Sequence, residues 1–292
     1  MISILIPTYQ YKVDALVNTL HEQAGRSNTD FEILVYDDGS PHPVHEHAAL
    51  NELTHVTYRH FPNNRGRSAI RHQLAQDARY ELLLFLDADV LPTTADFIHD
   101  YIGAITKETD VICGGIRYQD NANDQQQLRF VYGKKRESRT AQERQRDPFV
   151  IVTGNLLVRK ALFLESLIEL EHRYGEDLLL SQQFQERNAH ILHIDNPVWH
   201  LGLESSESYL QKSEEALSNL VHWEEQGKIR SNFTSLQRAY KRLRSWGMAP
   251  LFRGVVAALN RKIASNLRSK KPSLFWFDVY RLYFYAKLKH NA

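Results

Sequence analysis

The sequence predicts an α/β protein with a mixed, mainly parallel β-sheet flanked by helices, and a helical appendage at the C-terminus. Over the first half of the chain, short apolar runs alternate with stretches whose apolar residues recur at helical spacing. This alternation is typical of βαβ units. Polar clusters directly follow three of the predicted strands, which is where a parallel sheet gathers its ligands.

The elements follow from these patterns in order. Residues 2–6 form an apolar run that Pro7 ends, and residues 82–86 indicate a fully buried strand that ends at Asp87. Further strands are expected over residues 31–36, 56–59 and 191–194, and helices over residues 12–24, 68–79 and 204–228. The polar clusters are residues 7–9, 37–40 and 87–89, which we therefore expect to lie at one edge of the sheet.

Two regions depart from the alternation. Residues 117–147 are polar and show little periodicity before residues 128–132, so we expect a long loop that is either functional or disordered. The tail from about residue 235 is helical, basic and aromatic. We therefore predict an α/β domain over residues 1–205 and a helical, basic and aromatic region over residues 206–292.

The composition is that of an ordinary soluble globular protein, with 292 residues, 42% of them hydrophobic and 24% charged. The single cysteine, Cys113, excludes an internal disulfide and a cysteine-rich zinc cluster, and it suits a reducing compartment. No signal peptide follows Met1, and no uncharged apolar run reaches the length of about 18 residues that spans a membrane. We therefore expect a cytoplasmic protein.

The net charge of +1 conceals an uneven distribution. Residues 238–292 carry thirteen Lys or Arg and one acidic residue, Asp278, whereas the remainder of the chain is net acidic. An asymmetry of this kind indicates an anionic partner for the basic part.

The sharpest local feature is the pair of carboxylates at Asp87 and Asp89. Two acids one residue apart at the end of a buried strand can offer oxygen ligands to Mg²⁺ or Mn²⁺, with phosphate oxygens completing the shell. For an isolated pair, a solvated turn after the strand would be the favoured explanation. The apolar run before the pair and Pro92 after it favour the metal-binding interpretation.

Other polar groups each have a functional and a purely structural interpretation. Asp38, beside Gly39, either belongs to a simple turn or accepts a hydrogen bond from the N–H of a nucleotide base. Residues 63–71 hold three arginines before a helix, which form either a diphosphate cradle or a solvated basic turn. Glu176 and Asp177 open a helix, where acids are favoured by the helix dipole but could also supply a general base.

Several segments together resemble the inverting glycosyltransferases of family 2, which have the GT-A fold. The matching segments are ISILIPTY, VYDDGS, NNRGRSAIR, FLDAD, TGNLLVRKALF, GEDLLLSQQF and VWH. They run in family order and spacing from Ile2 to about His200, roughly two-thirds of the chain.

The resemblance implies a donor site for a nucleotide-sugar, most commonly a UDP-sugar. Its implied members are Pro7, Thr8, Tyr9, Asp38, Arg65, Arg71 and Asp87. The backbone of residues 7–9 and the Asp38 carboxylate would hold the base. Arg71, helped by Arg65, would neutralise the donor phosphates, and Asp87 would lie near the ribose and diphosphate.

The resemblance also implies the metal, the base and the acceptor side. Asp89 would bind Mn²⁺ or Mg²⁺, and His200 matches a position that completes the metal shell in some members. Asp177 would accept the proton of the acceptor hydroxyl in a single inverting displacement. The acceptor side would hold Gly154, Asn155 and Glu176.

The implied activity is transfer of a hexosyl or N-acetylhexosaminyl group to a hydroxyl of a carbohydrate or lipid-linked acceptor, in glycan or polysaccharide biosynthesis. The sequence departs from the family at Gln10, where many relatives have Asn, and in lacking the QxxRW-type segment of processive synthases after Asp177. We therefore expect a non-processive enzyme.

Three other functions were weighed against this one. A sugar-nucleotide pyrophosphorylase would need a glycine-rich loop with a lysine after the first strand, and residues 6–12 lack the glycines. A nucleic-acid-binding protein could use the basic tail, but an acidic catalytic half would repel a polyanion, so no nucleic-acid partner is expected. A catalytically inactive scaffold is disfavoured by the intact acidic pairs and Arg71.

The tail leaves two interpretations open. Its aromatic band holds Phe275, Trp276, Phe277, Tyr280, Tyr283, Phe284 and Tyr285. Aromatic and basic residues together favour an anionic membrane surface, which would place the protein peripherally on the inner face of the cell membrane. The alternative is that these aromatic residues pack against the rest of the protein and the charges face water.

Overall fold

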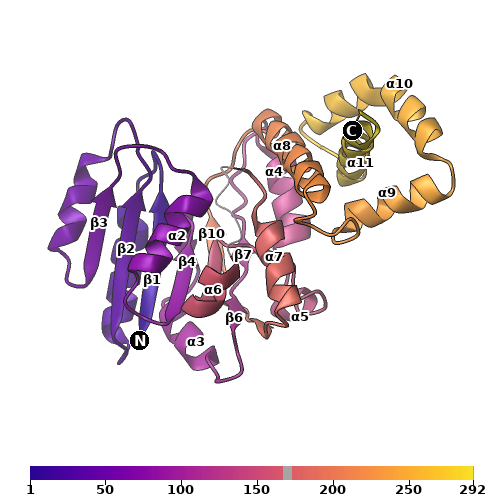
Figure 1. Cartoon of the computed structure of the whole chain (residues 1–292). Coiled ribbons are helices and arrows are strands. Elements are labelled where there is room, and N and C mark those ends of the chain that lie inside the picture. The colour runs from indigo at the N-terminus through magenta and orange to yellow at the C-terminus, as the bar shows by residue number, and fades with distance from the viewer. Residues whose placement is uncertain (167–172, 292) are drawn as a thin grey trace. The chain divides into compact units, whose positions relative to one another are not determined.

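The computed structural model describes residues 1–166 and 173–291, which form two compact units (Figure 1). Unit 1 comprises Met1–Gln119, Glu137–His172 and Glu176–Gly202, and unit 2 comprises Asp120–Arg136, Arg173–Gly175 and Leu203–Ala292. Unit 1 thus ends close to the predicted boundary at residue 205. Unit 2, however, takes in residues 120–136, which the sequence had placed in the α/β domain.

Unit 1 is built on a seven-stranded sheet in the order β3-β2-β1-β4-β8-β6-β9. Its strands are β1 (Ile2–Thr8), β2 (Phe31–Asp37), β3 (Val56–His60), β4 (Leu82–Leu86), β6 (Val111–Cys113), β8 (Asn155–Arg159) and β9 (Ile191–His193). The pairs β3–β2, β2–β1, β1–β4 and β6–β9 are parallel, and β8 pairs antiparallel with β4 and β6. The predicted mixed, mainly parallel sheet is therefore confirmed, and β8 is its antiparallel strand.

A second, three-stranded sheet in unit 1 contains β5 (Val90–Pro92), β10 (Val198–His200) and β7 (Ile116–Arg117), in the order β5-β10-β7. Strand β5 begins four residues after β4 ends, so only the segment 87–89 separates the two sheets along the chain. In the antiparallel register of β5 and β10, His200 lies opposite Val90. This register brings His200 next to the acidic turn.

The helices of unit 1 follow the strands they connect. They are α1 (Asp14–Arg26), the 3₁₀ helix His45–Glu52, α2 (Arg67–Asp77), α3 (Phe97–Ala104), α5 (Ala141–Arg144), α6 (Lys160–Ser166) and α7 (Asp177–Glu186). Apolar side chains of α2, α6 and α7, such as Leu74, Phe163 and Phe184, share one buried core with strand residues such as Leu5 and Phe85. These three helices therefore fix the positions of the residues at their ends against the sheet.

Unit 2 is helical. It contains α4 (Gln127–Tyr132), α8 (Ser206–Glu225), α9 (Ser235–Ser245), α10 (Ala249–Leu267) and α11 (Leu274–Asn291), while a π-helix at Gly133–Glu137 follows α4. Helix α4 belongs to this unit because it packs on α8. Leu128 is fully buried in the unit 2 core, and its backbone N–H donates a 3.1 Å hydrogen bond to Ser206 Oγ.

The segment 117–147 is thus not the long loop that its polar sequence predicted. It contains part of β7, then α4, the π-helix and α5. Local apolar periodicity does not predict these short helices, because most of their stabilisation comes from partners far along the chain.

The aromatic band of the tail packs inside unit 2. Phe277 and Tyr285 on α11 are buried, and Trp276, Tyr280 and Tyr283 lie against the core formed with α4, α8 and α10. The Tyr280 hydroxyl donates a hydrogen bond to Glu214 of α8. Packing within the helical unit therefore explains most of the band, although Phe275 remains largely exposed.

Candidate active site

The acidic turn between β4 and β5 is held against the start of β8. Because Leu86 pairs with Asn155 across the two strands, Gly154 lies beside Asp87, whose backbone N–H donates a 3.2 Å hydrogen bond to the Gly154 carbonyl oxygen. A Cβ atom at Gly154 would lie 2.6 Å from Asp87 Oδ2. The Asp87 carboxylate therefore requires glycine here, and the predicted acceptor-side residue Gly154 lies next to Asp87.

Asp89 and His200 form the second half of the turn. The register of β5 and β10 places His200 Nε2 3.6 Å from Asp89 Oδ2, and Leu201 N–H donates a 2.8 Å hydrogen bond to the Asp89 carbonyl oxygen. Both side chains are half-buried, and the other ring nitrogen of His200, Nδ1, is buried without a hydrogen-bond partner. A Cβ atom at Gly202 would lie only 2.0 Å from Asp89 Oδ2, so Gly202 leaves the space that this carboxylate occupies.

These two residues fit a divalent cation that a substrate helps to bind. Metal–ligand distances of about 2.1 Å allow a carboxylate oxygen and an imidazole nitrogen 3.6 Å apart to reach the same ion. Burial raises the pKa of Asp89, and neighbouring Asp87 adds to this while His200 opposes it. A cation would relieve that penalty on the charged carboxylate. Within the described residues no cluster of three His, Cys, Asp or Glu could hold a metal alone, so further ligands would have to come from a substrate or water.

Arg71 connects the acidic turn to the other acidic pair. It projects from α2 and is 3% exposed, with its Nη2 2.6 Å from Asp87 Oδ1 and its Nη1 3.6 Å from Glu176 Oε1. Its Nε and Nη1 and the Glu176 Oε2 are buried without hydrogen-bond partners. A buried guanidinium with unused donors beside two carboxylates is suited to receive an additional anionic group.

Arg71 lowers the pKa of both neighbouring acids, but the net pKa shifts of Asp87 and Glu176 have opposite signs. Burial alone would raise the pKa of Asp87, but the charges of Arg71, then Arg67 and His200, outweigh burial and hold that pKa below its usual value. Burial raises the pKa of Glu176 to about 7, although Arg71 opposes the shift. Glu176 therefore exchanges its proton near neutral pH, whereas Asp87 stays ionised.

Asp177 is the first residue of α7, directly after Glu176. Its Oδ1 accepts a 2.9 Å hydrogen bond from the hydroxyl of Thr153, which is buried next to Gly154. The start of α7 is thereby tied to the start of β8, and Asp177 lies close to the cluster formed by Asp87, Arg71 and Glu176. Thr153 was not among the predicted site residues, although its position directly before Gly154 could have indicated it.

The predicted base-binding residues gather at the ends of β1 and β2, where Thr8 pairs with Asp37. The buried Asp38 carboxylate accepts hydrogen bonds from the backbone N–H groups of Arg65 (2.9 Å) and Gly66 (2.8 Å). Asp38 thus holds the loop that leads into α2. Of the other predicted members, Thr8 is buried and Tyr9 is about half-exposed.

Arg65, which was predicted to help Arg71 neutralise donor phosphates, contacts Phe61 and Gln73 in this structure. Its guanidinium lies 5.1 Å over the ring of Phe61, and both its Nη atoms are 3.4 Å from Gln73 Oε1. Arg67, the first residue of α2, instead contributes to the positive field on Asp87, Asp89 and Glu176. The same NNRGRSAIR segment contains both arginines, so spacing along the loop could not distinguish them.

The prediction that Asn155 faces an acceptor is wrong in this structure. Asn155 is 2% exposed, and its Oδ1 accepts a 2.6 Å hydrogen bond from the Tyr101 hydroxyl. Its Nδ2 donates to the carbonyl oxygens of Gly115 (2.8 Å) and Asn196 (3.0 Å). Because both polar atoms of the amide are satisfied inside the protein, Asn155 holds β8 in place rather than binding substrate.

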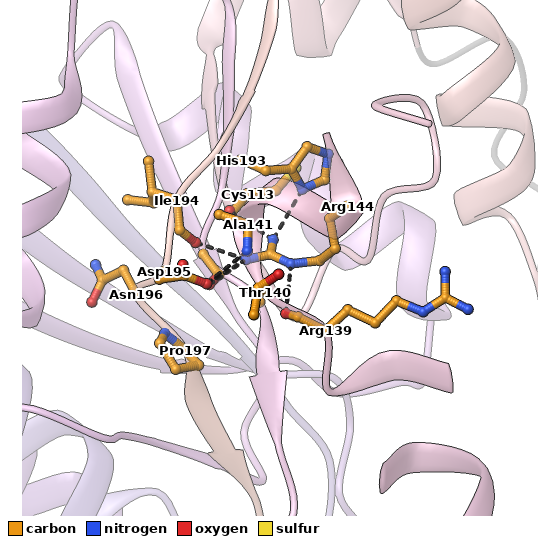
Figure 2. A network of polar contacts seen from close by, with 12 residues as sticks. Cys113, Arg139, Thr140, Ala141, Arg144, His193, Ile194, Asp195, Asn196 and Pro197 are labelled. Atoms are coloured by element: carbon orange, nitrogen blue, oxygen red, sulfur yellow. Dashed lines mark hydrogen bonds and ion pairs between the residues drawn. The ribbon is translucent and has the colours of Figure 1, made fainter. Parts of the chain in front are cut away.

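Arg144 holds α5 in place, and no local pattern in the sequence indicates this role. Figure 2 shows its guanidinium reaching carbonyl oxygens on two separate segments. It donates hydrogen bonds to Cys113 (3.0 Å), Gly114 (3.1 Å) and Ile194 (2.7 Å), and to the ring nitrogen Nδ1 of His193 (2.9 Å). Arg144 therefore fastens α5 to the ends of β6 and β9.

We expect Arg144→Ala to lower the free energy of unfolding by roughly 3 kcal/mol, because it removes a charged donor from several buried acceptors. Arg139→Ala, which removes only an exposed side chain from the same segment, should have little effect. Chemical denaturation of both variants measures the difference. Equal stability of the two would show that the network contributes no more than a surface residue.

The fold and the site define a glycosyltransferase of the GT-A class, since a mainly parallel sheet presents two acids at a strand end beside an arginine and a second acidic pair. Residues 3–166, more than half of the chain, match the family described as Glycosyl transferase family 2. The chain belongs to this family. The predicted family, fold and glycosyltransferase activity are thereby confirmed.

Solved structures share the fold over nearly the whole chain at low sequence identity. Residues 1–349 of S. aureus TarS are 20% identical, with 99% of this chain and 90% of that chain covered and a TM-score of 0.54. The same part of TarS in complex with UDP-GlcNAc is similar at 18% identity, with the same two coverages and a TM-score of 0.53. The mannosyltransferase PcManGT from Pyrobaculum calidifontis, in complex with GDP-Man and Mn²⁺, is 14% identical, with 99% and 86% covered and a TM-score of 0.59. Comparison with curated proteins gave no match.

Proposed function

We propose that this protein transfers a sugar from a nucleotide-sugar, a UDP-sugar, to a hydroxyl group of a carbohydrate or lipid-linked acceptor, with inversion and with the help of Mn²⁺ or Mg²⁺. One observation carries the proposal. Side chains from the β4–β5 turn, β10, α2 and α7 converge, with Arg71 in contact with both Asp87 and Glu176. Structural relatives with bound UDP-GlcNAc or with GDP-Man and Mn²⁺ support a nucleotide-sugar donor.

The donor diphosphate is assigned to Arg71 and the acidic turn. When bound, a divalent cation would neutralise charge on the leaving nucleoside diphosphate. Asp89 and His200 would hold it, since they are 3.6 Å apart and half-buried. Arg71 keeps Asp87 ionised and has unused N–H donors for a phosphate oxygen.

Asp177 is assigned as the general base. It would accept the acceptor hydroxyl proton as the oxygen attacks the anomeric carbon, while the bond from that carbon to the diphosphate breaks on the opposite face. One such displacement inverts the configuration and requires no covalent intermediate. The Thr153 hydroxyl, 2.9 Å from Asp177 Oδ1, fixes the orientation of this carboxylate.

UDP together with Mn²⁺ should raise the melting temperature by about 5 °C or more at a concentration well above the dissociation constant, because binding to the folded state alone stabilises it. UDP with EDTA should give a smaller rise, and a single-stranded oligonucleotide none. Thermal-shift measurements with GDP in place of UDP show whether the protein distinguishes uracil from guanine. Stabilisation by the oligonucleotide and by neither nucleotide would favour a nucleic-acid-binding protein instead.

The donor sugar is identified by incubating the enzyme with a panel of UDP-, GDP- and dTDP-sugars and measuring release of the nucleoside diphosphate. Mass spectrometry of products formed with candidate acceptors then gives the transferred group. Nucleotide binding without release of diphosphate from any donor or acceptor pair would indicate an inactive scaffold.

A further inference from the structure

Helices α9 and α10 meet at a turn that exposes four large apolar side chains. Trp246 is 70% exposed and Leu251 66% exposed, and Met248 and Val255 are exposed beside them in the sequence. We call Trp246, Met248, Leu251 and Val255 the α9–α10 apolar surface. Single exposed apolar residues are common on proteins, but a group of four within ten residues marks an interaction site.

The turn itself is well ordered by its backbone. Gly247 adopts a positive φ of 68°, and the Met248 N–H donates a 2.9 Å hydrogen bond to the Leu243 carbonyl oxygen. This arrangement ends α9 and starts α10 within a few residues, as glycine in the left-handed conformation commonly does at a helix end. Trp246 and Met248 are therefore held next to the first turns of α10.

Helix α10 is apolar on two faces. Val256, Ile263 and Leu267 face the unit 2 core, as their near-complete burial shows. Leu251 and Val255 are one turn apart on a different face, which is exposed. A surface helix that packed only on its own unit would carry polar residues on that second face.

The surroundings of the apolar surface are strongly basic. Residues 235–267 contain seven Lys or Arg and no Asp or Glu. Lys241, Arg242, Arg244, Arg261 and Lys262 are exposed, and within residues 1–166 and 173–291 none of them forms an ion pair with a carboxylate. The partner of this surface must therefore combine negative charge with an apolar phase.

We propose that the α9–α10 apolar surface inserts into the headgroup region of an anionic lipid bilayer and holds the enzyme there peripherally. Exposed Trp, Leu and Val match the boundary of the acyl chains, and the flanking basic residues match anionic headgroups. None of the helices that the structure describes is long and apolar enough to cross a membrane.

Other partners fit the surface less well. A second copy would bring two strongly basic surfaces together, which like-charge repulsion opposes. A nucleic acid would match the charge but gains little from Met248, Leu251 and Val255, because bases stack on aromatic rings. The membrane contact expected from the sequence is thereby moved from the aromatic band on α11, which packs inward, to the turn between α9 and α10.

Vesicle flotation of the full chain tests the proposal. The wild type should float with vesicles of phosphatidylcholine and phosphatidylglycerol but not with phosphatidylcholine alone, and binding should weaken as salt screens the charges. The double variant Trp246→Ser and Leu251→Ser should bind at least about tenfold more weakly, because it removes two inserting side chains. Replacing Arg244, Arg261 and Lys262 with Gln should reduce binding and its salt dependence.

Phe275→Ser is the matched control. Phe275 is 67% exposed, nearly the same as Trp246. It lies at the start of α11, which follows the C-terminal end of α10, whereas Leu251 is near the N-terminal end of α10. This variant should float as the wild type does. Unchanged melting temperatures for all variants show that folding is not the cause of any loss.

Three outcomes would overturn the proposal. They are wild-type binding that ignores lipid charge, equal binding by the Trp246→Ser/Leu251→Ser variant, and a wild-type dimer in light scattering that this variant converts to a monomer. Binding of an oligonucleotide that competes with the vesicles and is lost in the Gln variant alone would assign the basic residues to a nucleic acid instead.

Discussion

Asp177→Asn should lower the turnover number by about 10²–10⁴-fold, the contribution usual for a general base, while UDP binding stays near that of the wild type. The amide oxygen of Asn can still accept the hydrogen bond from Thr153, so the side chain keeps its position. It loses the ability to accept a proton from the acceptor hydroxyl. Steady-state kinetics with a saturating donor, together with calorimetric titration of UDP, measure both quantities.

Glu176→Gln is the matched variant for this prediction, since Glu176 is the adjacent acid. Its pKa of about 7 also makes it a chemically competent base. In our assignment Glu176 instead pairs with Arg71, so its loss should weaken donor binding more than it slows turnover. If Glu176→Gln abolishes turnover and Asp177→Asn remains active, the base is Glu176.

The two variants should also differ in the pH dependence of stability. The raised pKa of Glu176 means that the folded protein retains a proton that the unfolded chain releases, between the ordinary value of 4.5 and about 7. This group therefore lowers the free energy of unfolding as pH rises through that window, and Glu176→Gln should flatten the profile there. Asp177→Asn should narrow this window but not remove it, because burial is the largest cause of the raised pKa of Glu176 and the Asp177 charge is a smaller one.

Asp89→Ala should abolish the part of the activity that EDTA abolishes in the wild type, a loss of about 10²–10³-fold or more. Asp89 supplies the carboxylate oxygen of the proposed cation site, and no other carboxylate in the turn can replace it, because Asp87 is paired with Arg71. The protein should remain folded, since Asp89 is not fully buried and burial already disfavours its charge. Mn²⁺ titration in the presence of UDP checks the loss of metal binding directly.

Gly202→Ala tests the same site without removing a ligand. The added Cβ atom would lie 2.0 Å from Asp89 Oδ2 and would displace the carboxylate, so Mn²⁺ affinity should fall with all candidate ligands still present. Gly103→Ala on α3, where nothing lies within 4 Å of the added atom and the backbone is helical, is its control. Full wild-type activity in EDTA would refute the metal assignment, and unchanged Mn²⁺ affinity in His200→Ala would remove His200 from it.

The sequence predicted the strands of the parallel half because each is a short apolar run followed by polar residues. Strand β4 ends before Asp87 as predicted, whereas β1 continues through Pro7 to Thr8, two residues beyond its predicted end, because Pro7 and Thr8 pair with β2. Since parallel strands place their carboxyl ends at one edge, the local sequence also indicated where Asp87 and Asp89 would gather. The acidic turn was therefore predictable from residues close to it.

The surroundings of that turn were decided by contacts between distant segments. Asn155 is buried because Tyr101, Gly115 and Asn196 satisfy its amide, and Arg67 matters because its charge acts on Asp87. Arg144 has no local signature, since its partners are carbonyl oxygens far from it in the sequence. No spacing rule describes such contacts.

The sequence by itself determined the order of the elements, the location of the acidic turn and the strong positive charge of the C-terminal region, because each depends on local composition and periodicity. Only the tertiary structure decided which apolar residues of that region are used internally. The aromatic band on α11 is buried against α4, α8 and α10, whereas Trp246 and Leu251 are exposed. Hydrophobicity can be read from a sequence, but burial depends on which other surface is present to cover each side chain.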